Sequence, residues 1–277
     1  METRVRIAAI GEITEDAYLR GESIVARELG GISLNFARAA AFEGAEAHLF
    51  AAVGNDEAAK RIISALSSTD IVPHLQEMEG ASAVQRIKLS ATGERIFDGF
   101  TAGVMRHFAP SAADLATLRS FDLIALPASP DTAHFFPRLL AWGKQNGIRT
   151  AADFSIDSPL LSAAGPAEWV APFAAHLDVA FIGGDRTHEA ELQRLATSTN
   201  VLIVLTLGRE GAVAFRGDNE WRVDALPVQV VDTTGCGDAF QAAFATAFCG
   251  GAPIPQALQR AAQLAARVAA KRGASPA

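Results

Sequence analysis

The chain has 277 residues, of which 49% are hydrophobic and 20% are charged, so it can bury a sizeable core and is not wholly disordered. Its 24 basic and 31 acidic residues give a net charge of −7, which argues against a broad surface for nucleic acid or anionic membranes but allows a local phosphate pocket. No apolar run is long enough for a membrane span or a signal core. The two cysteines show neither a disulfide framework nor metal-ligand spacing, so we expect a cytoplasmic protein.

Short apolar runs alternate with amphipathic stretches along most of the chain. The predicted strands are Arg4–Ile10, Ala47–Val53, Leu123–Leu126, Arg149–Phe154, Asp178–Ile182 and Val201–Leu205. The predicted helices are Ser33–Glu43, Asp56–Leu66, Ala112–Arg119, Asp131–Gln145, Asp185–Ala196, Gly237–Phe248 and Ile254–Ala270. This alternation, with strands that are apolar throughout, predicts a doubly wound and mostly parallel α/β sheet with helices on both faces. We expect one domain over residues 1–277.

Two segments, residues 17–29 and 83–99, break this rhythm because polar and apolar residues alternate in them. Residues 91–94 read Ala-Thr-Gly-Glu, which is typical of a hairpin turn. These strands either form a small separate sheet, which would make a β lid over the mouth of the α/β domain, or they are edge strands of the main sheet. We favour the lid.

The most informative segment covers residues 230–240, where an apolar run ends in a glycine-bracketed turn and a helix is predicted to start. N–H groups in a first helical turn are unpaired and carry positive potential, so Gly235, Cys236 and Gly237 predict an anion hole. Asp238 lies beside it and could take a proton from a hydroxyl that attacks a phosphoryl group. The alternative is a plain tight turn in which Asp238 caps the helix.

This segment resembles the second signature of the ribokinase (PfkB) family of carbohydrate kinases, whose usual form is DTTGAGDAF, with Cys236 in place of Ala. The resemblance implies a ribokinase-like fold with Asp238 as catalytic base. It also implies that Gly235, Cys236 and Gly237 form the hole for the charge of the transferred phosphate. The Cys236 thiol is either activated by the helix start or buried and inert.

A Gly-Gly-x-x-x-Asn segment at residues 30–35, followed by a helix of small residues, resembles the first signature of the same family. The resemblance implies that Gly31 gives a sugar close access to the backbone and that Asn35 hydrogen-bonds its hydroxyls. Asp16 matches the acid that family members place after the first strand to accept sugar hydroxyls. Glu12 and Glu15 are nearby alternatives that we expect to be solvated.

A Thr-x-Gly-x-x-Gly motif after the strand at residues 201–205 resembles the nucleotide site of the family, and its alternative is an ordinary strand-ending turn. The residues assigned to ATP are Thr206, Gly208, Gly211, Asp232 and Thr234. ATP chemistry requires Mg2+ to neutralise phosphate charge. However, the Asn-x-x-Glu motif that helps many members arrange magnesium is missing, and Asp185 or Glu189 is a substitute candidate. The metal ligands are therefore unassigned.

The segment after Lys271 is short, so part of the loop that binds a monovalent cation in some relatives is absent from the pattern, and potassium activation is doubtful. Arg86, Lys88 and Arg95 in the lid either meet an acidic substrate or are solvated. None of the six histidines forms a metal or acid–base motif. Lid strands pair between subunits in the family, which implies a homodimer through the lid.

Residues 95–105 are similar to fructoselysine 6-kinase-like members of the family. The resemblance implies ATP-dependent phosphorylation of the 6-hydroxyl of a fructosamine. A ribose, fructose or nucleoside kinase of the same family is an alternative, and a non-catalytic sugar-binding regulatory protein is an alternative of another class. A dehydrogenase is disfavoured because no Gly-x-Gly-x-x-Gly follows the first strand.

Overall fold

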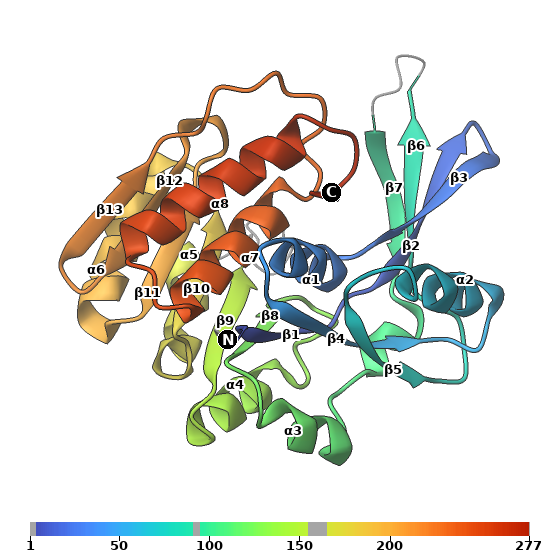
Figure 1. Cartoon of the computed structure of the whole chain (residues 1–277), viewed down its shortest axis with the longest axis horizontal. Coiled ribbons are helices and arrows are strands. Elements are labelled where there is room, and N and C mark those ends of the chain that lie inside the picture. Colours follow the sequence, from blue (N-terminus) through green and yellow to red (C-terminus); the bar gives the residue numbers. More distant parts are fainter. Residues whose placement is uncertain (1–3, 91–94, 155–164, 277) are drawn as a thin grey trace.

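The computed structural model describes residues 4–90, 95–154 and 165–276. Its main sheet has nine strands in the order β13-β12-β11-β10-β9-β8-β1-β4-β5 (Figure 1). The bounds of these strands are β1 (Arg6–Ile10), β4 (Glu46–Val53), β5 (Val72–Glu77), β8 (Leu123–Pro127), β9 (Arg149–Phe154), β10 (Val179–Gly183), β11 (Leu202–Thr206), β12 (Ala212–Arg216) and β13 (Asn219–Val223). The run from β11 to β5 is parallel, whereas β12 and β13 are antiparallel. The mostly parallel α/β prediction is therefore confirmed.

The strands read as continuous apolar runs because the sheet is covered on both faces. In β1, Ile7 and Ala9 belong to one buried cluster while Ala8 and Ile10 belong to the other. The helices that cover the first face are α1 (Ile32–Phe42), α2 (Glu57–Leu66), α7 (Cys236–Cys249) and α8 (Ile254–Ala269). Those that cover the second face are α3 (Ala112–Leu118), α4 (Phe136–Gln145), α5 (Pro166–Val170) and α6 (Glu189–Thr199).

Two helices start later than the sequence predicts, and local polar contacts explain both. The predicted start at Asp131 gives way to a turn in which Thr132 Oγ1 donates to the Pro127 carbonyl (2.6 Å), and α4 begins at Phe136. Asp185 accepts the Thr187 N–H and holds a 3-10 turn, so α6 begins only at Glu189. The short 3-10 turns are η1 (Gly103–His107), η3 (Ala171–His176), η4 (Arg186–His188) and η5 (Gly208–Glu210).

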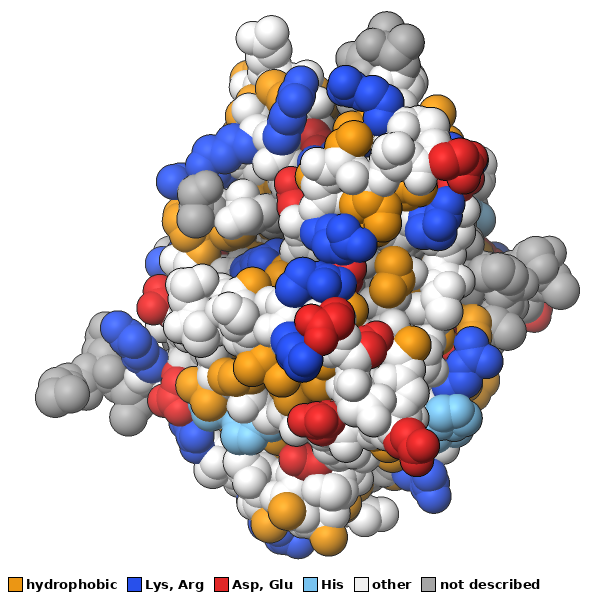
Figure 2. Space-filling view, turned by 90° about the vertical axis from the view of Figure 1, so that its right-hand side faces the viewer, with side chains coloured by type: hydrophobic (Ala, Val, Ile, Leu, Met, Phe, Trp, Pro, Cys, Tyr) orange, Lys and Arg blue, Asp and Glu red, His pale blue; other side chains and the backbone are white. Residues whose placement is uncertain are grey.

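A second sheet of four strands stands beside the main one, in the order β3-β2-β6-β7 (Figure 1). Its strands are β2 (Thr14–Arg20), β3 (Ser23–Gly30), β6 (Val84–Leu89) and β7 (Arg95–Thr101). This sheet confirms the predicted β lid and excludes edge strands of the main sheet; the predicted turn at residues 91–94 lies outside the described residues. Lys and Arg side chains gather on the upper half of the face that carries the lid (Figure 2).

One strand of the main sheet, β5, lacks a clear sequence signal. β5 reads Val-Pro-His-Leu-Gln-Glu and lies at the edge of the main sheet, where one side needs no apolar cover. The hairpin of β12 and β13 extends the other edge. Among the described residues, no helix combines the length and apolarity needed to cross a membrane.

Candidate active site

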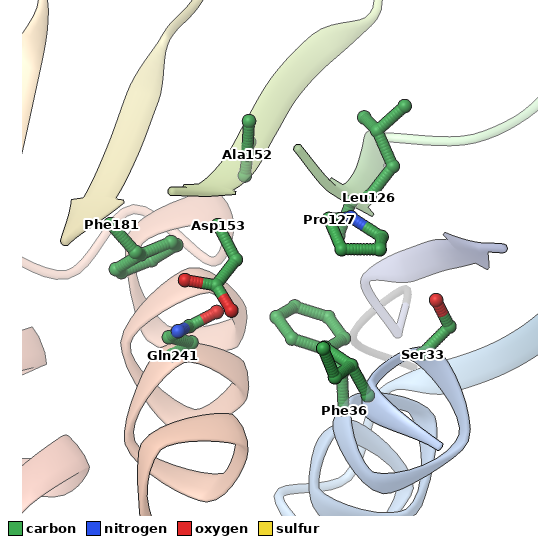
Figure 3. A pocket seen from close by; sticks show the side chains of 11 residues that line it. Ser33, Phe36, Leu126, Pro127, Ala152, Asp153, Phe181 and Gln241 are labelled. Carbon is green, nitrogen blue, oxygen red and sulfur yellow. The ribbon is translucent and has the colours of Figure 1, made fainter. Parts of the chain in front are cut away.

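The site lies where the parallel strands end, because their carboxyl termini meet at one edge of the sheet. Glu12 follows β1 there, Asp153 lies near the end of β9 and Thr206 ends β11. A hollow at this edge is lined by the ends of β8 and β9 and by the starts of α1 and α7. In Figure 3, Asp153 and Gln241 point toward each other on one side of it, opposite Ser33 and Phe36.

Asn35 and Asp238 join the two signature motifs, although 203 residues separate them. Asn35 Nδ2, on α1, donates to Asp238 Oδ2 in the first turn of α7 (2.9 Å). Burial raises the pKa of Asp238 to about 6, and the Asn35 amide acts against this rise. The carboxylate is therefore ionised at neutral pH and more basic than an exposed aspartate, which suits a general base. Asn35 is 8% exposed, and its Oδ1 has no hydrogen-bond donor within the described ranges.

The turn before α7 has the shape of an anion site. Gly235 has φ 74°, and a Cβ there would lie 2.3 Å from the Ala274 side chain, so only glycine fits. The Cys236 N–H already donates to the Thr233 carbonyl (3.2 Å). In the part of the chain that is described, the backbone N–H groups of Gly235, Gly237 and Asp238 have no backbone acceptor.

The Cys236 thiol is not activated by the helix start. Burial, followed by the charges of Asp232 and Asp238, raises its pKa to about 11. The inert alternative therefore holds for this cysteine.

Asp16 and Gly31 lie on the lid side of the site. Asp16 sits on β2, where Thr14 Oγ1 donates to its Oδ1 (2.7 Å) and where burial raises its pKa. Gly30 leaves room for this carboxylate, because a Cβ at Gly30 would lie 2.3 Å from Asp16 Oδ2. Gly31 caps α1 with φ 104°, and a Cβ there would lie 2.7 Å from the Glu12 carbonyl oxygen. The sequence motif thus marks a true close approach of two backbone segments.

The expectation that Glu12 and Glu15 are solvated is wrong. Glu15 is 5% exposed and accepts hydrogen bonds from Arg27 (2.9 Å) and Arg61, so it ties the lid to α2. Glu12 is half-buried. Burial and the charge of Asp238 raise its pKa to about 7.

Asp153 is a site residue that the sequence reading missed. It lies in β9, and the Gln241 side chain of α7 points toward its carboxylate and acts to lower its pKa (Figure 3). Burial and then the charge of Asp238 raise the pKa of Asp153 to about 7. The signal that could have revealed it is a single acid near the carboxyl end of an apolar strand, where α/β sheets bind ligands.

Magnesium needs one or two carboxylates together with the phosphates of its nucleotide. Asp153 and Asp238 interact with each other electrostatically, and a pair of carboxylates fits this chemical requirement. No group of three His, Cys, Asp or Glu residues in the described ranges could hold a metal on its own. The two substitutes considered for the missing Asn-x-x-Glu are engaged elsewhere, because Asp185 holds Thr187 and Glu189 pairs with Arg222 (2.6 Å).

The residues assigned to the nucleotide follow β11 and precede α7. Thr206 Oγ1 donates to the Ile182 carbonyl (3.3 Å), and Gly208 is exposed beyond it. Gly211 has φ 92°, and a Cβ there would lie 2.0 Å from the Val223 carbonyl oxygen, so the motif also forms the turn into the β12–β13 hairpin.

Asp232 and Thr234 are joined to each other. Thr234 N–H donates to Asp232 Oδ1 (2.9 Å), and Gly273 N–H donates to Asp232 Oδ2 (2.9 Å). Both carboxylate oxygens of Asp232 therefore have donors within the protein, which fits a role in ordering the loop.

The lid cations are paired within the protein. Lys88 and Arg86 both lie near Asp98 of the lid, at 2.6 Å and 3.5 Å. Arg95 reaches out of the lid to Asp232 at 3.3 Å. The sequence analysis left two roles open for Arg95, contact with an acidic substrate or exposure to solvent. The structure shows neither, because Arg95 pairs with a carboxylate of the protein itself.

Comparison with known proteins agrees with this geometry. The model of the pfkB family carbohydrate kinases matches residues 6–277. The chain is 30% identical over 274 residues to the fructoselysine 6-kinase of Escherichia coli, covering 97% of this chain and 98% of the relative. It is 26% identical to the fructosamine kinase FrlD of Bacillus subtilis, covering 98% and 93%. Adenosine kinase from Sinorhizobium meliloti has the same fold, with a TM-score of 0.83, 19% identity and coverage of 99% and 96%.

Proposed function

Since the chain belongs to the pfkB family of carbohydrate kinases and is a phosphotransferase, we propose that it transfers the terminal phosphoryl group of ATP to the 6-hydroxyl of a fructosamine. The observation that carries the proposal is the contact between Asn35 on α1 and Asp238 in the first turn of α7. This contact places the amide that we assign to sugar binding beside a carboxylate whose pKa is raised.

In the proposed mechanism, a sugar lies between the lid and α1. Asn35 Oδ1 accepts a hydrogen bond from a sugar hydroxyl, and Asp16 accepts another. Asp238 takes the proton from the attacking hydroxyl as the new O–P bond forms and the bond to ADP breaks. The free N–H groups of Gly237 and Asp238 face the charge that develops on the phosphoryl oxygens. Positioning and electrostatics supply most of the rate in such transfers.

Magnesium, when bound with ATP, supplies positive charge that neutralises the phosphates. Asp153 is the residue that we propose holds it, with Asp238 nearby. The Gln241 side chain, which points toward the Asp153 carboxylate, would help to orient it (Figure 3). These residues take the place of the missing Asn-x-x-Glu motif.

The charge around Glu12 supports a cationic sugar. The charged groups that shift its pKa are Asp238, Asp131 and Asp16, all of them acids. The arginines Arg95 of the lid and Arg38 of α1 act on Asp16, and neither is among the groups that shift the pKa of Glu12. A fructosamine carries a secondary amine that is protonated at neutral pH, and such an ammonium group would relieve this repulsion. The names of the two full-length relatives, a fructoselysine kinase and a fructosamine kinase, agree with that chemistry.

The test is ADP release from MgATP by the purified protein, with fructoselysine, other fructosamines, fructose, ribose and adenosine as separate acceptors. We expect turnover on fructosamines, with the product phosphorylated at the 6-hydroxyl by NMR. Turnover confined to ribose or adenosine would show that the proposed substrate class, the fructosamines, is wrong. Sugar binding without ADP release on any acceptor would favour the non-catalytic alternative.

We also propose that two copies pair through the lid. β3 and β7 are the edges of the lid sheet, and they carry the exposed side chains of Ile24, Val25, Ile96, Phe97 and Phe100. Exposed apolar edge strands favour pairing with another chain. A solution mass of one subunit by light scattering, at micromolar protein, would contradict this.

A further inference from the structure

One ion pair connects the lid to the loop that precedes α7. Arg95 is the first residue of β7, and its Nη1 lies 3.3 Å from Asp232 Oδ2. The guanidinium also lies over the ring of Tyr18 on β2, at 4.9 Å from the centroid. The Arg95 and Asp232 side chains are 19% and 12% exposed, so solvent screens this pair less than a surface pair.

Asp232 is the point at which the loop is held. Its Oδ1 accepts the N–H of Thr234, three residues before Gly237, and its Oδ2 accepts the N–H of Gly273 after α8. Hydrogen bonds to the charged form, together with Arg95, outweigh burial and lower the pKa of Asp232. Moving this carboxylate would therefore disturb both the loop and the segment that follows α8.

The segment that follows α8 is the second wall of the anion site. Ala274 packs so closely on Gly235 that a Cβ at Gly235 would lie 2.3 Å from it. The Pro276 carbonyl oxygen, further along, accepts from Arg267 Nε (2.9 Å) and Lys271 Nζ (3.4 Å). Arginine and lysine side chains of this chain thus contact oxygen atoms both in the loop before α7, at Asp232, and in the segment after α8, at Pro276.

We propose that Arg95 is a positioning residue for phosphoryl transfer. When the lid covers the site, the Arg95 guanidinium holds Asp232 in place, and Asp232 in turn holds the loop that presents the Gly237 and Asp238 amides. The position of the lid and the order of the anion hole are then coupled, so that a sugar covered by the lid lies next to an ordered anion hole. The kinetic part rests on the proposed kinase function, whereas the ordering of the loop does not.

The test compares Arg95→Ala with Lys88→Ala, whose ion pair to Asp98 lies wholly within the lid. Amide hydrogen exchange of residues 232–238 measures order without any substrate. We expect exchange in Arg95→Ala to be at least about tenfold faster than in the wild type and in Lys88→Ala, because local opening becomes easier. Equal exchange in all three proteins would overturn the proposal, even if no acceptor sugar were turned over.

The kinetic arm separates positioning from sugar binding. We expect kcat of Arg95→Ala to fall at least about tenfold while KM for the sugar changes less than about threefold, with partial recovery in added guanidinium chloride. An Arg95→Ala variant with unchanged kcat would contradict the proposal.

Discussion

Asp153→Asn is expected to stabilise the protein while impairing catalysis. The Asp153 side chain is half-buried beside Asp238, and loss of hydration together with the charge of Asp238 raises its pKa from 3.8 to about 7. The folded state therefore binds a proton more tightly than the unfolded state, so stability falls as pH rises from about 4 to 7. A shift of this size corresponds to roughly 4 kcal/mol above pH 7. Part of it is repulsion shared with Asp238, so we expect a gain of about 2 kcal/mol for asparagine at pH 8.

The measurement is urea unfolding of both proteins at pH 8 and pH 4. Asparagine has the same size as aspartate and keeps one acceptor oxygen, so no cavity is introduced. The gain should shrink to less than about 1 kcal/mol at pH 4, where the aspartic acid is neutral in the folded state. As a control of opposite sign, Asp56→Asn should destabilise the protein, because Asp56 Oδ1 accepts the Ala59 N–H (2.9 Å) and its Oδ2 accepts the Ser82 N–H (2.9 Å). Asparagine offers only one oxygen for these two donors. A loss of stability in Asp153→Asn at pH 8 would refute the reasoning.

Three further outcomes follow from the site. The value of kcat/KM should begin to fall as pH drops through about 7, where Asp153 takes up a proton, and should fall further below about 6, where Asp238 loses its capacity to accept one; a profile that is flat down to pH 5 would contradict both roles. Glu12→Gln should lower kcat/KM for a fructosamine by about tenfold but should change kcat/KM for fructose by less than about threefold. Equal losses on both acceptors would refute the role of Glu12 in recognising the ammonium group. Gly31→Ala should cost about 2 kcal/mol or more of stability and most of the activity, because φ is 104° and the Glu12 carbonyl oxygen occupies the place of the Cβ; thermal unfolding unchanged within error would show that the backbone adapts.

Those parts of the fold that depend on burial could be predicted from the sequence. β1 is apolar throughout because its neighbouring residues enter opposite cores, and the lid strands alternate because they form a separate sheet. The edge strand β5 could not be predicted from apolar periodicity, because it lies at the edge of the main sheet and its polar residues need no apolar partner there. The start of α4 was placed too early because a threonine contact, invisible to periodicity, holds a turn there.

Several contacts of the site depend on tertiary geometry and could not be predicted. The family resemblance named Asn35 and Asp238 separately, but only the packing of α1 on α7 shows that they touch. Asp153 read as an ordinary strand residue, since its burial beside Asp238 depends on the order of the strands. Arg95 pairs with Asp232 because of the angle of the lid, which sequence spacing does not encode.

The most direct test of the account is the turnover number of Asp238→Asn with MgATP and a saturating fructosamine. Asparagine preserves the size of the side chain but cannot accept the proton, so we expect kcat to fall by about 10²–10⁴ with an unchanged circular dichroism spectrum. Asp218→Asn, in the exposed turn between β12 and β13, is the matched control and should retain wild-type turnover. An Asp238→Asn variant that turns over at nearly the wild-type rate would contradict the central claim that this carboxylate is the base.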